Sequence, residues 1–272
     1  MTSQSGKVEA FHRLHAEGCF VMPNPWDVGS AIALEQLGFP ALATTSAGFA
    51  WTQGRPDNGV RRDEALEHLR QIAGAVSVPV NADFEDGFAR EPDGVAENVK
   101  LAAATGICGL SIEDSTGDAG EPLYPFELAV ERIRAARKAI DDSATRVVLT
   151  GRSEGFVVGR PDLEETIRRL QAYAEAGADC LYAPFVTTIE QVSAIVAAVA
   201  PKPVNLLVPA PFITVADAAA LGVRRVSVGG SLARVAWAAA LDAANEIAGE
   251  GTFSRLADLP GNGDLNSLFG AR

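Results

Sequence analysis

The chain has 272 residues, 47% of them hydrophobic, and a formal net charge of −12 at pH 7. This length suits a single α/β barrel, and the hydrophobic share supplies a large core and argues against disorder. An acidic surface repels nucleic acid and anionic membranes, so we expect neither as a partner.

The termini and cysteines indicate a cytoplasmic protein. Residues 1–9 are polar and contain no apolar segment, so neither a signal peptide nor a membrane span is expected. Cys19, Cys108 and Cys180 are widely spaced and form no CxxC pair, which suits a reducing compartment. We expect them to pack within strands.

Short apolar runs alternate with segments rich in Ala, Leu, Glu and Arg along the whole chain. Several helical stretches end near a glycine, which tolerates the left-handed conformation of a helix C-cap. These glycines are Gly38, Gly106, Gly177 and Gly222. The apolar runs are centred near residues 21, 43, 81, 110, 149, 182, 205 and 227, and the clearest helical segments are 62–76, 92–105, 125–140, 162–177 and 188–200.

Eight strand–helix alternations predict an α/β fold, a single (β/α)8 TIM-type barrel over residues 1–272. A doubly wound open sheet is the rival, but no GxGxxG follows the first strand. The tail from about residue 249 is expected to be irregular and to pack on the barrel or on a neighbouring subunit. The Gly229–Gly230 turn is interpreted as a helix start rather than a phosphate site.

Acidic residues gather where the third and fourth strands end. Asp83 and Glu85 are two residues apart, so on a strand they share a face, and Glu113 ends the next strand. Carboxylates that face one small volume need a cation or protonation. Oxygen ligands without nearby His or Cys favour Mg2+, with Mn2+ as the alternative. We expect Asp83 to bind Mg2+ directly, and Glu85 and Glu113 to act partly through water.

Other polar residues near these strand ends have simpler interpretations. Asp86 and Asp114 are expected to be helix caps or solvated. His12, His15 and His68 lie in helical segments away from strand ends, so a zinc site is not expected and solvated positions are.

Arg152 ends the fifth strand, where its guanidinium suits a carboxylate, and ion pairing with Glu154 or Glu113 is the alternative. Ser46 and Ala47 lie in a turn after the second strand, and Asp57 lies in the following loop, which has the length of a lid.

Six motifs taken together resemble the isocitrate lyase/phosphoenolpyruvate mutase superfamily. They run from Asn24 to Arg234 and read NPWDVGSA, TTSAG, VNADFEDG, GLSIEDS, the GR of LTGRSEG, and LGVRRVSVGGSLAR. The resemblance implies a Mg2+-dependent barrel that acts on a small 2-oxo acid or its enolate. It also implies tetramers built from dimers that exchange a C-terminal helix, so we expect a homo-oligomer, a dimer or tetramer, with the segment after Leu232 swapped between subunits.

The resemblance assigns roles residue by residue. It makes Asp83 the direct metal ligand, with Glu85 and Glu113 as supporting acids. For the substrate it implies Arg152, with Asn205 at the end of the seventh strand. Thr44, Ser46 and Ala47 are expected to hold the oxo acid, and Asp57, Glu113 and Arg152 to be catalytic.

The stretch after the fourth strand, STGDAGEPLYPFELA, departs from the family. Lyase members carry a KKCGH-type loop there, and mutases a lysine and an asparagine, whereas this stretch has no Cys, Lys, His or Asn. The family histidine near the sixth strand is also absent, since Ala183 and Pro184 stand there. Carbon–carbon cleavage resembling that of oxaloacetate decarboxylase fits these departures best. Alternatives are isocitrate or methylisocitrate lyase-like retro-aldol cleavage, phosphonopyruvate hydrolase-type P–C cleavage, and non-catalytic binding of a 2-oxo acid.

Overall fold

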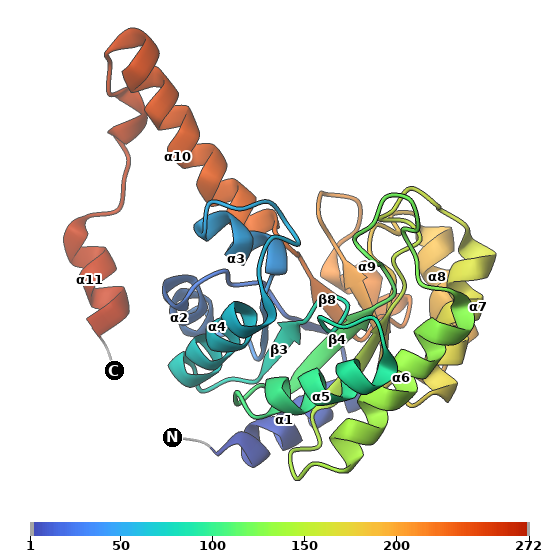
Figure 1. The fold of residues 1–272 in the computed structure, drawn as a ribbon. Coiled ribbons are helices and arrows are strands. Elements are labelled where there is room, and N and C mark those ends of the chain that lie inside the picture. The colour runs from blue at the N-terminus through green and yellow to red at the C-terminus, as the bar shows by residue number, and fades with distance from the viewer. Residues whose placement is uncertain (1–2, 271–272) are drawn as a thin grey trace.

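The computed structural model describes residues 3–270, so residues 1, 2, 271 and 272 of the predicted domain lie outside the described part. Eight parallel strands pair in the order β1-β8-β7-β6-β5-β4-β3-β2. This is the predicted TIM-type α/β fold (Figure 1). The strands are β1 (Phe20–Val21), β2 (Leu42–Ala43), β3 (Val80–Asp83), β4 (Gly109–Glu113), β5 (Val148–Arg152), β6 (Cys180–Tyr182), β7 (Val204–Leu207) and β8 (Arg225–Ser227).

Helices follow the strands and cover the outside of the sheet (Figure 1). The predicted glycine caps are confirmed, because Gly38, Gly106, Gly177 and Gly222 all have φ between 87° and 106°. The helices are α1 (Gln4–Ala16), α2 (Val28–Gln36), α3 (Ser46–Thr52), α4 (Arg62–Ala75), α5 (Pro92–Ala103), α6 (Phe126–Asp141), α7 (Leu163–Glu175), α8 (Ile189–Val199), α9 (Val215–Ala220), α10 (Ser231–Glu250) and α11 (Asn262–Gly270), with a 3-10 turn η1 (Ser254–Leu256).

The first and last strands of this order lie next to each other. The Ala43 amide at the end of β2 donates to the Pro23 carbonyl just after β1, at 3.0 Å, and the Asn24 side chain donates to the Thr44 carbonyl, also at 3.0 Å. These bonds bring the two edge strands together at the carboxyl end of the sheet. A ring of strand ends results, and it positions the candidate site.

Helix α1 packs against the opposite ends of the strands. The Phe11 ring lies so close to Gly109, the first residue of β4, that an added Cβ would come within 2.7 Å of it. His15 meets Phe20 of β1 edge to face and contacts Arg225 of β8. His15 and His68 are both buried, so the expectation of solvated positions is wrong for these two histidines and holds for His12.

The C-terminal segment differs from the prediction. Residues 251–253 and 257–261 are irregular as expected, but residues 262–270 form α11, which packs on α2 through a hydrogen bond from the Gln36 side chain to the Leu268 carbonyl. Helix α10 extends outward from the barrel (Figure 1). Within residues 3–270, no helix has both the length and the apolar character that crossing a membrane requires.

Candidate active site

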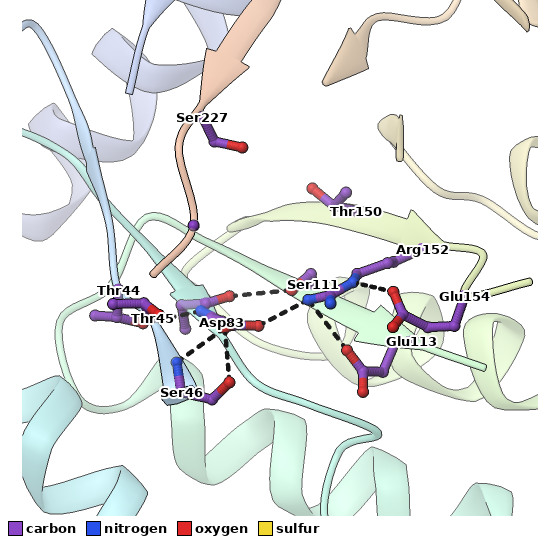
Figure 2. A network of polar contacts seen from close by, with 12 residues as sticks. Thr44, Thr45, Ser46, Asp83, Ser111, Glu113, Thr150, Arg152, Glu154 and Ser227 are labelled. Carbon is purple, nitrogen blue, oxygen red and sulfur yellow. Dashed lines mark hydrogen bonds and ion pairs between the residues drawn. The ribbon is translucent and has the colours of Figure 1, made fainter. Parts of the chain in front are cut away.

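Three neighbouring strands bring charged side chains together at their carboxyl ends. Asp83 ends β3, Glu113 ends β4, and Arg152 ends β5 directly beside Glu113 in the ladder. The Arg152 Nη1 lies 3.0 Å from Asp83 Oδ1 and 3.1 Å from Glu113 Oε2, and its Nε pairs with Glu154. Figure 2 shows the guanidinium between these three carboxylates. The ion-pair alternative for Arg152 is therefore present, with Asp83 as an additional partner.

The start of α3 fixes Asp83 from the other side. The Ser46 amide and hydroxyl both donate to Asp83 Oδ2 at 2.9 Å (Figure 2). The Asp83 amide donates to the Thr44 hydroxyl at 2.9 Å. The predicted turn is in fact the first turn of a helix capped by Thr45. Amides in a first helical turn have no intrahelical acceptor, so the Ala47 amide remains available to an anion, whereas the Ser46 amide is already bound to Asp83.

Asp57 reaches this cluster from the loop after α3. Its Oδ1 accepts from the Asn58 amide at 3.0 Å and lies 3.4 Å from the Ser46 hydroxyl. Burial, with the neighbouring Asp83 carboxylate, raises the pKa of Asp57. This carboxyl is therefore a better proton carrier near neutral pH than an exposed aspartate.

Glu85 does not continue the strand as the sequence predicted. Its φ of 48° is left-handed, so the alternation that placed Asp83 and Glu85 on one face stops at Asp83. Burial, followed by repulsion from Asp83 and Asp57, raises the pKa of Glu85 to about 8. Glu85 thus lies within the electrostatic field of the cluster without pairing with Arg152.

The cluster holds more carboxyl groups than its one arginine can neutralise. Burial raises the pKa of Glu113 well above its ordinary value, although Arg152 opposes this, and burial also raises the pKa of Glu154. Within residues 3–270, no three His, Cys, Asp or Glu side chains are grouped to hold a metal ion. Asp83, Glu85 and Glu113 therefore form no three-ligand cage here, because Arg152 lies between Asp83 and Glu113 and the backbone of Glu85 turns at the strand end.

The donor set nevertheless fits a hard divalent cation. It consists of oxygen atoms alone, and several buried carboxylates share one guanidinium. Mg2+ commonly uses one or two protein carboxylates and completes its shell with water and substrate oxygens, so a full protein cage is not required.

A cavity of about 240 Å3 opens at these strand ends. All the predicted site residues line it except Glu85 and Glu113; the lining ones are Thr44, Ser46, Ala47, Asp57, Asp83, Arg152 and Asn205. The Asn205 amide is already engaged, since its Nδ2 donates to the Ser227 hydroxyl at 3.0 Å and its Oδ1 accepts from Arg225 at 2.8 Å.

Sequence reasoning missed several residues of this region. Tyr182 of β6 lies beside Arg152, with its ring centroid 5.2 Å from the guanidinium carbon. Ser227 and Arg225 of β8 line the cavity. These residues also lie at or near strand ends, which is the signal that could have found them. In the sequence, however, an arginine at the start of a short strand is typical of a surface position.

Asp114 is a buried anchor rather than a solvated cap. Its Oδ1 accepts from the Glu154 amide at 2.7 Å. Its Oδ2 accepts from Arg169 at 3.1 Å and from the Tyr173 hydroxyl at 2.6 Å. Asp114 therefore holds the residue that pairs with Arg152, and the expectation of a cap or a solvated position is wrong for it.

A TIM-type barrel with buried, interacting charges at the carboxyl ends of its strands has the architecture of barrel enzymes, which build their active sites at that face. The chain belongs to the phosphoenolpyruvate phosphomutase family, whose model matches residues 11–248. It is thus a member of the isocitrate lyase/phosphoenolpyruvate mutase superfamily, as its motifs predicted.

Its relatives carry several activities. An uncharacterised protein of Mycobacterium tuberculosis is 36% identical over 81% of each chain. The 2-methylisocitrate lyase of Escherichia coli is 32% identical over 58% of this chain and 55% of the lyase. An oxaloacetate decarboxylase of Bradyrhizobium sp. is 31% identical over 64% of this chain and 62% of the decarboxylase.

Solved structures extend this likeness over the whole chain. A candidate lyase/mutase from Burkholderia cenocepacia shares 46% identity, with a TM-score of 0.96 and 98% of both chains covered. A phosphonopyruvate hydrolase in complex with oxalate and Mg2+ shares 27% identity, with a TM-score of 0.86, 99% of this chain and 95% of the hydrolase covered.

Proposed function

We propose that this protein is a Mg2+-dependent carbon–carbon lyase that cleaves a small 2-oxo acid through an enolate, as an oxaloacetate decarboxylase does. One observation carries the proposal. Asp83 is fixed by Ser46 and Arg152 at the cavity, and Arg152 is shared among three carboxylates. The likeness to an oxaloacetate decarboxylase and to a hydrolase that holds Mg2+ supports it.

Asp83 is the residue that would hold Mg2+, or Mn2+ in its place, with Glu85 and Glu113 acting through water. When bound, the cation supplies Lewis-acid polarisation of the substrate's 2-oxo oxygen. Because Arg152 lies 3.0 Å from Asp83, a cation on Asp83 would release that contact, and Arg152, still held by Glu113 and Glu154, could bind the substrate carboxylate.

The residues of the chain bind the substrate and move the proton. Arg152 and the Ala47 amide hold the 1-carboxylate and the 2-oxo group, and the Ser46 amide joins them once Asp83 turns to the cation. In oxaloacetate the C3–C4 bond breaks, its electron pair moves into the C2–C3 bond, and CO2 leaves. The resulting enolate takes a proton at C3 to give pyruvate, and Asp57 is positioned to donate it.

Retro-aldol cleavage is the second candidate, and the likeness to 2-methylisocitrate lyase favours it. In this reaction the substrate hydroxyl loses its proton to Asp57 as the C2–C3 bond breaks, so that C2 becomes the oxo carbon of pyruvate. The electron pair stays on C3 as the enolate of succinate, which then takes a proton. The segment between β4 and α6, which holds no Cys, Lys, His or Asn, supports decarboxylation because that bond cleavage needs no base. Phosphonopyruvate hydrolysis and non-catalytic binding remain outcomes of the test.

The test is pyruvate release from oxaloacetate with Mg2+ and with EDTA, corrected for the metal-catalysed background. We expect metal-dependent turnover that Asp83→Asn reduces by at least about 100-fold. Asp141→Asn, on the exposed side of α6, is the matched control and should keep wild-type activity. Pyruvate together with succinate from 2-methylisocitrate would establish the retro-aldol candidate instead. No turnover of either substrate, or of phosphonopyruvate, would contradict the lyase.

We also propose that the protein associates with further copies of itself through α10 and works in the cytoplasm. Residues 235–241 of this helix carry no charge, and Val235, Trp237 and Leu241 are exposed. An apolar helix surface of this kind is normally covered, and a swapped helix between subunits would cover it. The three free cysteines support a reducing compartment.

A further inference from the structure

Arg225 is a buried cation whose partners are all neutral. It lies on β8 inside the barrel and is 2% exposed. Its Nε donates to Asn205 Oδ1 at 2.8 Å, and its Nη2 donates to the Thr150 hydroxyl at 3.0 Å. Its Nη1 lies 3.1 Å from His15 Nε2, which must accept, because His15 Nδ1 donates to the Phe11 carbonyl.

Within residues 3–270, Arg225 forms no ion pair, unlike the other buried arginines. Arg152 and Arg169 each lie within 3.1 Å of at least one carboxylate, and Arg132 lies 3.9 Å from Asp86. Burial of a charge without a counter-charge is unfavourable. A guanidinium has five N–H groups, and the three contacts of Arg225 use three of them. Its charge and two donors are therefore unmatched.

The unmatched charge lies at the inner end of the candidate active site. Arg225, Asn205 and Ser227 line the same cavity as Asp83 and Arg152. Thr150, which contacts Arg225, precedes Arg152 by two residues on β5, a rise of about 6.6 Å along a strand. Figure 2 shows no dashed contact between Thr150 or Ser227 and the carboxylate cluster. The charges that line the outer end are thus mixed, Asp57 and Asp83 with Arg152 and Arg234, whereas Arg225 is the charged residue one side-chain layer below.

We propose that Arg225 forms an anion subsite at the inner end of the cavity, which binds a second carboxylate of the substrate. The subsite rests on the proposed function, because the first carboxylate and the 2-oxo group occupy the outer end. A chain of four or five carbons bridges the two layers. The arginine thereby makes the enzyme select 2-oxo acids with two carboxylates over those with one.

A matched pair of ligands tests the subsite in the wild-type protein. 2-Oxoglutarate and 2-oxopentanoate are both five-carbon 2-oxo acids and differ in the distal carboxylate. In buffer with Mg2+, calorimetry should show 2-oxoglutarate binding at least about tenfold more tightly. Equal affinities would overturn the subsite and leave the proposed function intact. Failure of both ligands to bind would overturn the two together.

Variants then assign the preference to Arg225. Arg225→Gln should bring the two affinities within about twofold while 2-oxopentanoate binds as before, and Arg225→Lys should keep part of the preference. Arg224→Gln, on the half-buried neighbour whose side chain donates to the Gly18 carbonyl, is the control. Near-ultraviolet circular dichroism checks that α1 stays in place. A preference that survives in folded Arg225→Gln would refute the assignment.

Kinetics give a second readout that a purely structural arginine would not produce. A carboxylate must leave its ion pair before it departs as CO2, so Arg225 contributes to substrate binding and not to bond breaking. Arg225→Gln should therefore raise the KM for oxaloacetate by about tenfold without lowering kcat. A fall in kcat at unchanged KM would contradict the subsite.

Discussion

Removal of the Asp114 carboxylate tests whether Asp114 holds Glu154, a partner of Arg152, in place. Asp114→Ala leaves the Glu154 amide and the Tyr173 hydroxyl without their acceptor, and it deprives Arg169 of one carboxylate. Arg169 keeps Glu165 at 2.8 Å, which moderates the loss. Breaking a buried ion pair costs about 3–5 kcal/mol, and each orphaned buried group about 1–3 kcal/mol. Because these costs overlap, we expect the free energy of unfolding to fall by about 4 kcal/mol.

Urea unfolding, followed by circular dichroism and tryptophan fluorescence together, measures this change. Asp114→Asn keeps one oxygen acceptor and should lose about half as much stability as Asp114→Ala. Asp141→Ala removes the acid of an exposed pair on α6 and should cost at most about 1 kcal/mol. A loss for Asp114→Ala no larger than that of Asp141→Ala would refute the role of Asp114 as a buried anchor.

Two further predictions concern pH and association. Burial, with the neighbouring Arg225, lowers the pKa of His15 from 6.5 to about 3, so the unfolded chain binds the extra proton between these values and stability falls as pH drops below 6.5. His15→Gln should therefore be less sensitive to a shift from pH 7.5 to pH 5 than the wild type, by about 2 kcal/mol in urea unfolding, and equal sensitivity would contradict the neutral His15. Trp237→Glu on α10 should give a smaller species in analytical ultracentrifugation, whereas Leu101→Glu, an exposed apolar residue of α5, should not; an unchanged mass for Trp237→Glu would place the contact elsewhere.

The fold and the strand-end positions were predictable because their signals are local. Each apolar run precedes or follows a helical segment within a few residues, and glycines such as Gly106 and Gly222 mark helix ends through their backbone freedom. Eight successive strand–helix units are compatible with few folds, and the closed barrel is the main one. Once a barrel is predicted, Asp83, Glu113 and Arg152 must face the same mouth, because parallel strands end on one side.

The exact partners of these residues were not predictable. Whether Arg152 binds Glu113, Glu154 or Asp83 depends on register between strands, and the structure shows that it contacts all three. The left-handed φ of Glu85 is a local backbone choice that an alternating pattern cannot reveal.

The amino-acid sequence by itself determined the barrel, the acidic strand ends and the family, since these follow from local periodicity and short motifs. Only the tertiary structure decided which charges are matched. Asp114, expected to be a helix cap or solvated, is enclosed by Arg169 and Tyr173. Arg225 contacts His15, which lies 210 residues earlier in the chain, and it forms no ion pair with a carboxylate within residues 3–270. The physical reason is that burial and charge pairing arise between segments distant along the chain, and they exist only once the ring of strands has formed.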